Sequence, residues 1–116
     1  MASKDTVERY LYALFGGRPD FETVRSLLTD EFTFEGPMMK ASSADDFIVQ
    51  LESMADGRKM RAEIHHLIED GERVAALYDY VGPAGKTSFA EWFWVKGDKI
   101  SAIKLHFDPR PLLNAA

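Results

Sequence analysis

Apolar residues recur three and four positions apart in the first third of the chain, which is the period of a helix that buries one face. The pattern covers residues 7–15 and returns over residues 21–28. Gly16-Gly17 follows the first stretch and favours its end, while Pro19-Asp20 precedes the second and is typical of a helix start. The pattern therefore predicts two short helices.

A third helical pattern follows a pair of serines. This helix would begin at Ser42 or Ser43 and carry two aspartates in its first turn, where the helix dipole favours negative charge. Gly57 would end it.

The stretch EFTFEGP, residues 31–37, alternates with a period of two instead. Phe32, Phe34 and Gly36 would share one face of a short strand, and Glu35 would point to the other face. We expect this strand to lie between the second and third helices.

From residue 60 onward the period of two continues, interrupted only by turn residues. Helices first and hairpins afterwards indicate an α+β fold with a mostly antiparallel sheet, in a single domain over residues 1–116. The helices would bury their apolar faces on one side of this sheet. The predicted strands are 61–69, 73–81, 87–96 and 99–107, with turns at Asp70-Gly71, Gly82-Pro83-Ala84-Gly85 and Gly97-Asp98.

Composition narrows the class of protein. A chain of 116 residues with 46% hydrophobic residues can bury one proper core. A net charge of −5 argues against a nucleic-acid partner, and the lack of cysteine excludes disulfides and thiolate chemistry. No apolar run is long enough for a membrane span, and the first residues lack the apolar core of a signal peptide. We expect a cytoplasmic protein.

The most apolar stretch, SFAEWFWVKGDKI (residues 88–100), contains one acid, Glu91. Burying an unpaired carboxylate costs several kcal/mol, so its environment matters. If Gly97-Asp98 forms a two-residue loop, Glu91 lies opposite Lys104, in an ion pair worth about 0.2–1 kcal/mol. If the loop has three residues, Glu91 lies opposite Leu105 on an apolar face. A shift of one residue exchanges the two faces, and the residues alone leave both registers open.

The order of elements, with the stretches RYLYAL, FTFEGP, FAEWFWV and KLHFDP, resembles the nuclear-transport-factor-2-like superfamily. That superfamily includes the ketosteroid isomerases and the SnoaL-like polyketide cyclases. The resemblance covers nearly the whole chain. It implies a curved sheet wrapped around the N-terminal helices as a cone, with an apolar pocket inside.

The resemblance also implies roles for particular residues. In ketosteroid isomerases a tyrosine and a protonated acid hold the substrate oxygen, and an aspartate moves the proton. Tyr10 matches the tyrosine and Glu91 matches the acid, as Glu instead of Asp. Gly36 occupies the position of the proton acceptor and has no side chain, while the adjacent Glu35 would point to the opposite face. Half of the isomerase site is therefore expected here.

Further residues are expected around the pocket and on the back of the sheet. Trp92 and Trp94 would share the back face, where the resemblance implies a homodimer interface. His65 and His66 would point to opposite faces, which argues against a shared metal ion, and no cofactor motif is found. The expected pocket residues are Phe32, Phe34, Tyr78, Tyr80, Phe89, Phe93, Leu105 and Phe107.

Two functions follow from this reading. The first is an acid–base enzyme of the isomerase, cyclase or dehydratase type, acting on a small apolar molecule with a carbonyl or enol group and needing no cofactor. The second is a non-catalytic module that binds a small molecule or another protein, because a fold does not decide function.

Overall fold

The computed structural model confirms the α+β fold, and it describes residues 2–55, 60–82 and 85–113. The predicted helix end at Gly57 and the predicted turn residues Pro83 and Ala84 lie outside the described residues. The described helices are α1 (Ser3–Phe15), α2 (Phe21–Ser26), α3 (Ala44–Ala55) and α4 (Arg110–Leu113). The described strands are β1 (Gly16–Gly17), β2 (Leu28–Glu35), β3 (Lys40–Ala41), β4 (Met60–Asp70), β5 (Arg73–Gly82), β6 (Gly85–Lys96) and β7 (Lys99–His106).

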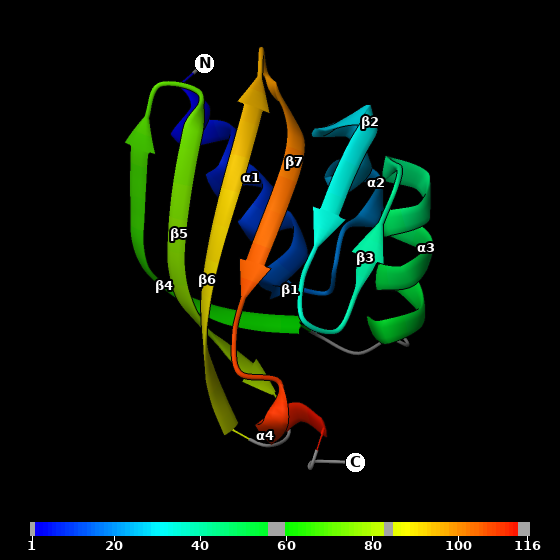
Figure 1. Ribbon diagram of the computed structural model, residues 1–116, viewed down its shortest axis with the longest axis vertical. Helices are drawn as coiled ribbons and strands as arrows, with labels where there is room; N and C mark the ends of the chain where they lie inside the picture. Colours follow the sequence, from blue (N-terminus) through cyan, green and yellow to red (C-terminus); the bar gives the residue numbers. More distant parts are fainter. Residues whose placement is uncertain (1, 56–59, 83–84, 114–116) are drawn as a thin grey trace.

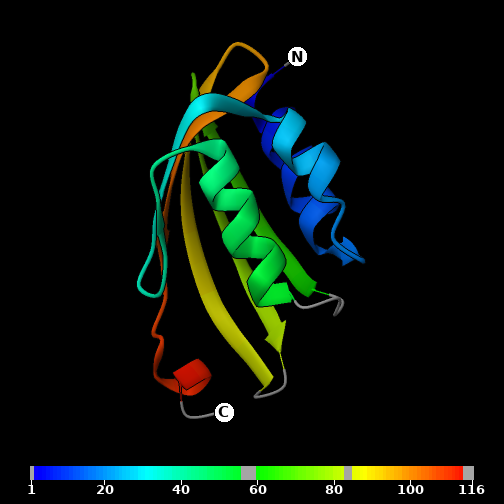
Figure 2. The same ribbon diagram turned by 90° about the vertical axis from the view of Figure 1, so that its right-hand side faces the viewer.

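The strands form one curved sheet in the order β1-β4-β5-β6-β7-β2-β3, in which only β2 and β7 are parallel among the described pairs. Helices α1, α2 and α3 lie together against the concave face of this sheet, and the other face carries no helix (Figures 1 and 2). None of the helices in the described ranges is long and apolar enough to cross a membrane.

Helix α2 begins where the sequence predicts and ends earlier. The Asp20 side chain accepts a hydrogen bond from the Thr23 backbone N–H at 3.1 Å and so caps the first turn. The prediction that the helix continues to Leu28 is wrong, because Leu28 is the first residue of β2 and pairs with Ile100 of β7. The Leu28 side chain is fully buried in the strand, and an apolar residue at that spacing would also be expected to be buried in a helix. The helical spacing alone therefore does not distinguish a helix from a strand at Leu28.

The hairpin between β6 and β7 combines features of both predicted registers. The loop has two residues, since Lys96 pairs with Lys99, yet Glu91 lies opposite Leu105. The pairing shifts because Ser101 is an extra residue in β7, and its hydroxyl donates a hydrogen bond to the Trp94 carbonyl at 3.1 Å. This β-bulge shifts the pairing register by one residue, so that the side chains of β7 after Ser101 exchange faces of the sheet.

A second bulge lies in β4. Ile64 pairs with Tyr78 and His66 pairs with Leu77, which leaves His65 without a partner residue in the backbone pairing of β4 with β5. His65 and His66 border one shallow hollow on the outer face of the sheet. The prediction that these two histidines point to opposite faces is therefore wrong, because alternation does not continue through a bulge.

The core lies between the concave face and the helices. Phe32 of β2 is completely buried, and the ring of Phe47 from α3 lies 4.9 Å from it. On the other side of the core, Phe93 is completely buried and meets the ring of Tyr10 from α1 edge-on at 5.6 Å. These contacts hold two helices at fixed positions over the sheet.

We expect Phe32→Ala to lower the free energy of unfolding by about 3–5 kcal/mol, because it opens a cavity in close-packed core. Thr33→Ala is the matched control, since Thr33 is the next residue of β2 and is exposed. Urea unfolding of both variants measures the two costs. Equal costs would contradict the orientation of β2.

Candidate functional site

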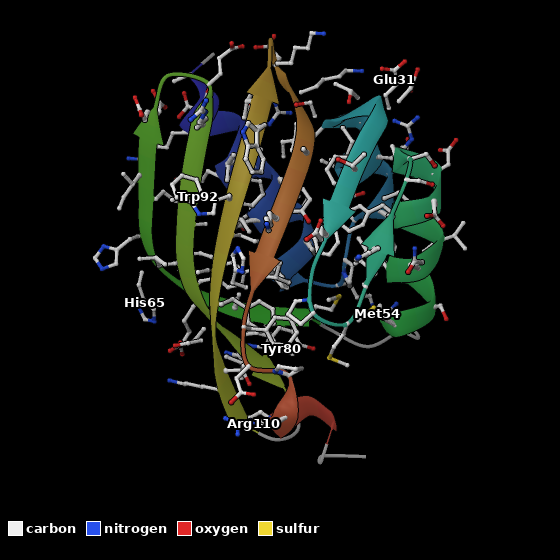
Figure 3. The ribbon with its side chains drawn as sticks, in the orientation of Figure 1. Glu31, Met54, His65, Tyr80, Trp92 and Arg110 are labelled. Atoms are coloured by element: carbon white, nitrogen blue, oxygen red, sulfur yellow. The ribbon has the colours of Figure 1, made fainter. Side chains whose placement is uncertain are left out.

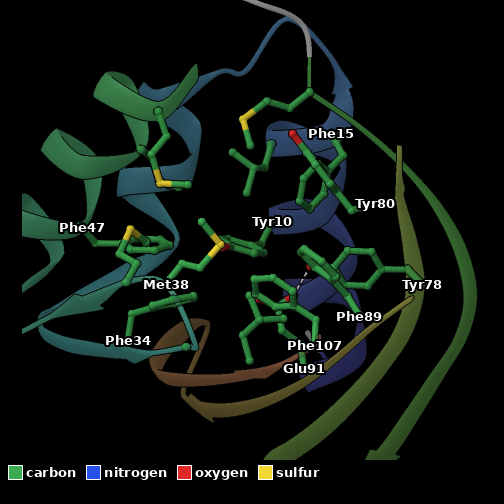
Figure 4. Close-up of a pocket in the computed structure, with 17 residues that line it drawn as sticks. Tyr10, Phe15, Phe34, Met38, Phe47, Tyr78, Tyr80, Phe89, Glu91 and Phe107 are labelled. Carbon is green, nitrogen blue, oxygen red and sulfur yellow. Dashed lines mark hydrogen bonds between the residues drawn. The ribbon is translucent and has the colours of Figure 1, made fainter. Parts of the chain in front are cut away.

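A cavity of about 380 Å³ lies between the helices and the concave face of the sheet (Figure 4). Its wall is almost entirely aromatic, aliphatic and thioether in character, with a single carboxylate. Such a wall suits a mostly apolar small molecule with one polar group. The lining residues are Tyr10, Leu14, Phe15, Phe34, Gly36, Met38, Met39, Phe47, Leu51, Met54, Met60, Tyr78, Tyr80, Phe89, Glu91, Leu105 and Phe107.

The carboxylate belongs to Glu91, on the inward face of β6. Glu91 is 4% exposed, and its Oε1 accepts a hydrogen bond of 2.7 Å from the Tyr78 hydroxyl (Figure 4). Burial raises the pKa of the Glu91 carboxyl to about 7, although the hydrogen bond from Tyr78 acts in the opposite direction. Near neutral pH the group can therefore both give and take a proton.

Tyr78 reaches Glu91 because of the pairing of β5 with β6. Ala76 lies directly opposite Glu91, which makes Tyr78 a diagonal neighbour on the same face. Burial and the Glu91 charge raise the pKa of Tyr78 well above its ordinary value. The sequence predicts Tyr78 as a wall residue and misses this hydrogen bond, which counting back from the Gly82–Gly85 turn would have indicated.

Tyr10 approaches the same carboxylate from α1. Its side chain is 1% exposed and lines the cavity. Burial, and then the neighbouring charge of Glu91, raise the pKa of Tyr10 well above its ordinary value. The two residues that the resemblance associates with oxygen binding thus face one cavity, together with Tyr78.

The expected wall residues divide into two groups. Phe32 and Phe93, both fully buried, lie in the core and do not line the cavity, which corrects their predicted place. The others line it as expected, and the stacking of Phe89 on Phe107, with ring centroids 4.4 Å apart, joins β6 to the segment after β7. The expected residues that do line the cavity are Phe34, Tyr78, Tyr80, Phe89, Leu105 and Phe107.

Further wall residues come from the helices, the loops and the start of β4, and sequence reasoning assigns only Met38 and Met39 of them to the pocket mouth. Phe15 of α1 lies 5.5 Å from the ring of Tyr78, and Phe47 of α3 stacks 4.8 Å from Phe34. The helical period places these rings on the buried face of each helix, but it cannot say which buried residues face an unfilled volume. Four methionines, Met38, Met39, Met54 and Met60, complete the wall.

No second acid–base group joins Glu91 among the described lining residues apart from the tyrosines. Gly36 lines the cavity, and an added Cβ there would lie 3.1 Å from the Phe34 ring. Glu35 points to the outer face, where its Oε1 is 3.9 Å from the Lys104 amine. The position that would hold the isomerase base has no side chain.

The outer face of the sheet carries the residues expected at an interface. Trp92 is 46% exposed and lies on the face opposite to the helices (Figure 3). Trp94, two residues further along β6, is 37% exposed. Ile68, Ala75 and Trp92 occupy adjacent positions across β4, β5 and β6. An apolar strip of this kind is unusual on a free surface.

Glu63, His65 and Asp79 also lie on the outer face, with ligand atoms within 4.8 Å of one another. His65 Nε2 is 3.1 Å from Asp79 Oδ2, and Lys86 Nζ is 2.8 Å from Glu63 Oε1. The contact of His65 with Asp79 and the ion pair of Lys86 with Glu63 therefore account for the cluster. It lies on the opposite side of the sheet from the cavity.

The chain thus has a curved sheet closed by helices around an apolar cavity with one buried carboxylate. The family model of the SnoaL-like domain matches residues 7–103, so the chain belongs to the SnoaL-like domain family. Among proteins with curated descriptions, none matches this sequence.

Solved structures agree with this fold. An NTF2-like protein from Cytophaga hutchinsonii is 24% identical, with a TM-score of 0.84 over 97% of this chain and 96% of that chain. An LEH-like epoxide hydrolase from Mycobacterium tuberculosis is 22% identical, with a TM-score of 0.77 over 97% of this chain and 87% of that chain. At these identities the likeness establishes the fold alone.

The raised pKa of Glu91 predicts a particular pH dependence of stability. The native state retains the proton up to about pH 7, whereas the unfolded chain releases it near 4.5. The stabilisation is therefore complete below pH 4.5 and is lost as pH rises through 7, with a total of about 3 kcal/mol.

Glu91→Gln removes this titration. We expect the free energy of unfolding of the variant, minus that of the wild type, to rise by about 3 kcal/mol between pH 4.5 and 8. Urea unfolding across this range measures it, with Glu52→Gln, an exposed carboxylate of α3, as the control for the loss of one charge. A difference that does not change with pH would mean that Glu91 is solvated or paired.

Proposed function

We propose that the chain binds a small, mostly apolar molecule in the cavity and holds its carbonyl, enol or phenol oxygen at Glu91. The observation that carries this proposal is the Glu91 carboxyl itself, buried at an apolar wall and bonded to Tyr78 at 2.7 Å. A protonated Glu91 can donate a hydrogen bond to the ligand oxygen, and the Tyr10 hydroxyl, at the same cavity, is placed to add a second.

The corresponding reaction is acid–base chemistry of the isomerase, cyclase or dehydratase type. Glu91 would give a proton to the developing oxygen anion or take one from an adjacent carbon, because a pKa of about 7 suits both directions. The apolar wall excludes water, which strengthens the hydrogen bond at the reacting oxygen. No cofactor is needed for such a proton transfer.

A second candidate is binding without catalysis, and Gly36 is the observation that favours it. An isomerase that moves a proton between two carbons needs a base in addition to the acid that holds the ligand oxygen, and the described wall offers one carboxylate. Chemistry that requires a single acid–base group, or no chemistry, fits this wall better than a complete isomerase reaction.

Thermal stabilisation by simple and polycyclic phenols tests the oxygen-binding role. A ligand at about 100 times its Kd adds about 2.7 kcal/mol to the free energy of unfolding. We expect this gain in the wild type, and a much smaller gain in Tyr10→Phe, which keeps the ring and removes the hydroxyl.

Tyr12→Phe is the matched control, because Tyr12 lies on the same helix and is 78% exposed. Glu91→Gln should lose activity on any substrate found. If it retained full activity while Tyr10→Phe bound phenols as the wild type does, the oxygen-binding role of this site would be excluded.

We further propose that two copies associate through the outer sheet face around Trp92 and Trp94. The support is the apolar strip of Ile68, Ala75 and Trp92 on that face, in which Ile68 is 59% exposed. Leu77, two residues after Ala75 on β5, is 40% exposed. Burial of such side chains against a second copy would remove them from water.

Sedimentation at micromolar concentration is expected to give a dimer that Trp92→Glu converts to a monomer, because a charge would be buried at the contact. Val49→Glu is the control, since Val49 is 64% exposed on α3, away from this face. A wild-type monomer at these concentrations would rule out the interface.

A further inference from the structure

The cavity wall contains an acid without a base. Among the described lining residues no lysine, arginine or histidine is found, and Glu91 is the only carboxylate. Lys104, the residue next to Leu105 on β7, points to the outer face and lies 3.9 Å from Glu35. When Glu91 ionises, none of the described lining residues offers a cation to balance its charge.

Aromatic rings surround the same volume. Tyr10, Tyr78 and Phe89 contribute rings on the side of Glu91, where Phe107 stacks on Phe89, and Phe34 lies on the opposite side of the cavity (Figure 4). The face of an aromatic ring carries partial negative charge and attracts organic cations at short range. The thioethers of the methionine side chains are polarisable and adapt to an irregular apolar body.

We propose that the cavity takes a second class of ligand, a hydrophobic organic cation such as a substituted ammonium, with its charge beside Glu91. The apolar body would lie against the rings and methionines, and the cation would supply the counter-charge that the described part of the wall does not contain. This inference rests on the proposed function in one respect: the cavity must admit a ligand as far as Glu91.

The two ligand classes require opposite charge states of Glu91. An oxygen acceptor binds the protonated acid, whereas a cation binds the carboxylate. The titratable groups that face Glu91 are Tyr78 from β5 and Tyr10 from α1, and β7 presents the apolar Leu105. Both tyrosines have raised pKa values, so between pH 6 and 8 Glu91 alone changes charge among these groups.

The expected pH effect follows from the fraction of ionised Glu91. With a pKa of about 7, this fraction rises from about one in ten at pH 6 to about nine in ten at pH 8. A permanently charged ligand should therefore bind about tenfold more tightly at pH 8 than at pH 6. The affinity for a phenol or a ketone should instead be higher at pH 6 than at pH 8.

The test compares two probes of the same shape, benzyltrimethylammonium and neopentylbenzene, in which a neutral carbon replaces the charged nitrogen. Binding to the full chain is followed by chemical-shift changes at pH 6, 7 and 8. We expect the ammonium to bind more tightly than the hydrocarbon at pH 8 and to lose about tenfold in affinity at pH 6. The affinity for the hydrocarbon should change little with pH.

Variants separate the site from general attraction to an acidic protein. Glu91→Gln should remove the preference for the ammonium and leave hydrocarbon binding unchanged. Glu52→Gln, which removes an exposed carboxylate from α3, should keep the preference. Loss of the preference in Glu52→Gln but not in Glu91→Gln would overturn the inference.

Other outcomes distinguish this inference from the function on which it rests. If phenols bind and the ammonium does not, the cation is excluded while the oxygen-binding role stands. If both probes bind equally at every pH, Glu91 does not recognise charge, and the inference fails. If neither the probes nor phenols bind, the cavity admits no ligand and both proposals fail together.

Discussion

One extra residue in β7 decides what stands beside the buried acid. The pairing of β5 with β6 already turns Glu91 toward the concave face. Without the bulge at Ser101, the same two-residue loop would bring Lys104 opposite Glu91 and point it into the cone. With the bulge, Leu105 occupies that position and Lys104 lies outside.

The chemistry of the site depends on having Leu105, and not Lys104, opposite Glu91. A lysine beside Glu91 would hold the carboxylate charged and lower its pKa. With Leu105 there and Tyr78 as its hydrogen-bond donor, burial dominates, and the pKa rises to about 7. The buried acid costs stability when it ionises, and it lies at the wall of a cavity. That combination is typical of functional sites.

The fold could be predicted from the sequence because its signals are local. The period of two after residue 60 predicts all four long strands to within a few residues, and Asp20 caps α2 as its position indicates. The end of α2 could not be predicted, because Leu27 and Leu28 are buried either way and the pairing of Leu28 with Ile100 decides the outcome.

The site could be predicted only in part, because its details depend on how distant elements meet. Alternation places both Phe93 and Phe89 on the inner face, but Tyr10 covers Phe93 and leaves Phe89 at the cavity. Both bulges lie in strands whose alternation gives no sign of an extra residue. The residues alone therefore leave the register of Leu105 open, although the family resemblance favours the observed one, and the shared face of His65 and His66 could not be foreseen.

The most direct measurement is the titration of the Glu91 side-chain carboxyl carbon by NMR, assigned by its absence in Glu91→Gln. We predict a midpoint near pH 7, well above those of exposed glutamates. A midpoint near the ordinary value of 4.5 would mean that water or a cation reaches the carboxylate, and the site would not be the one described.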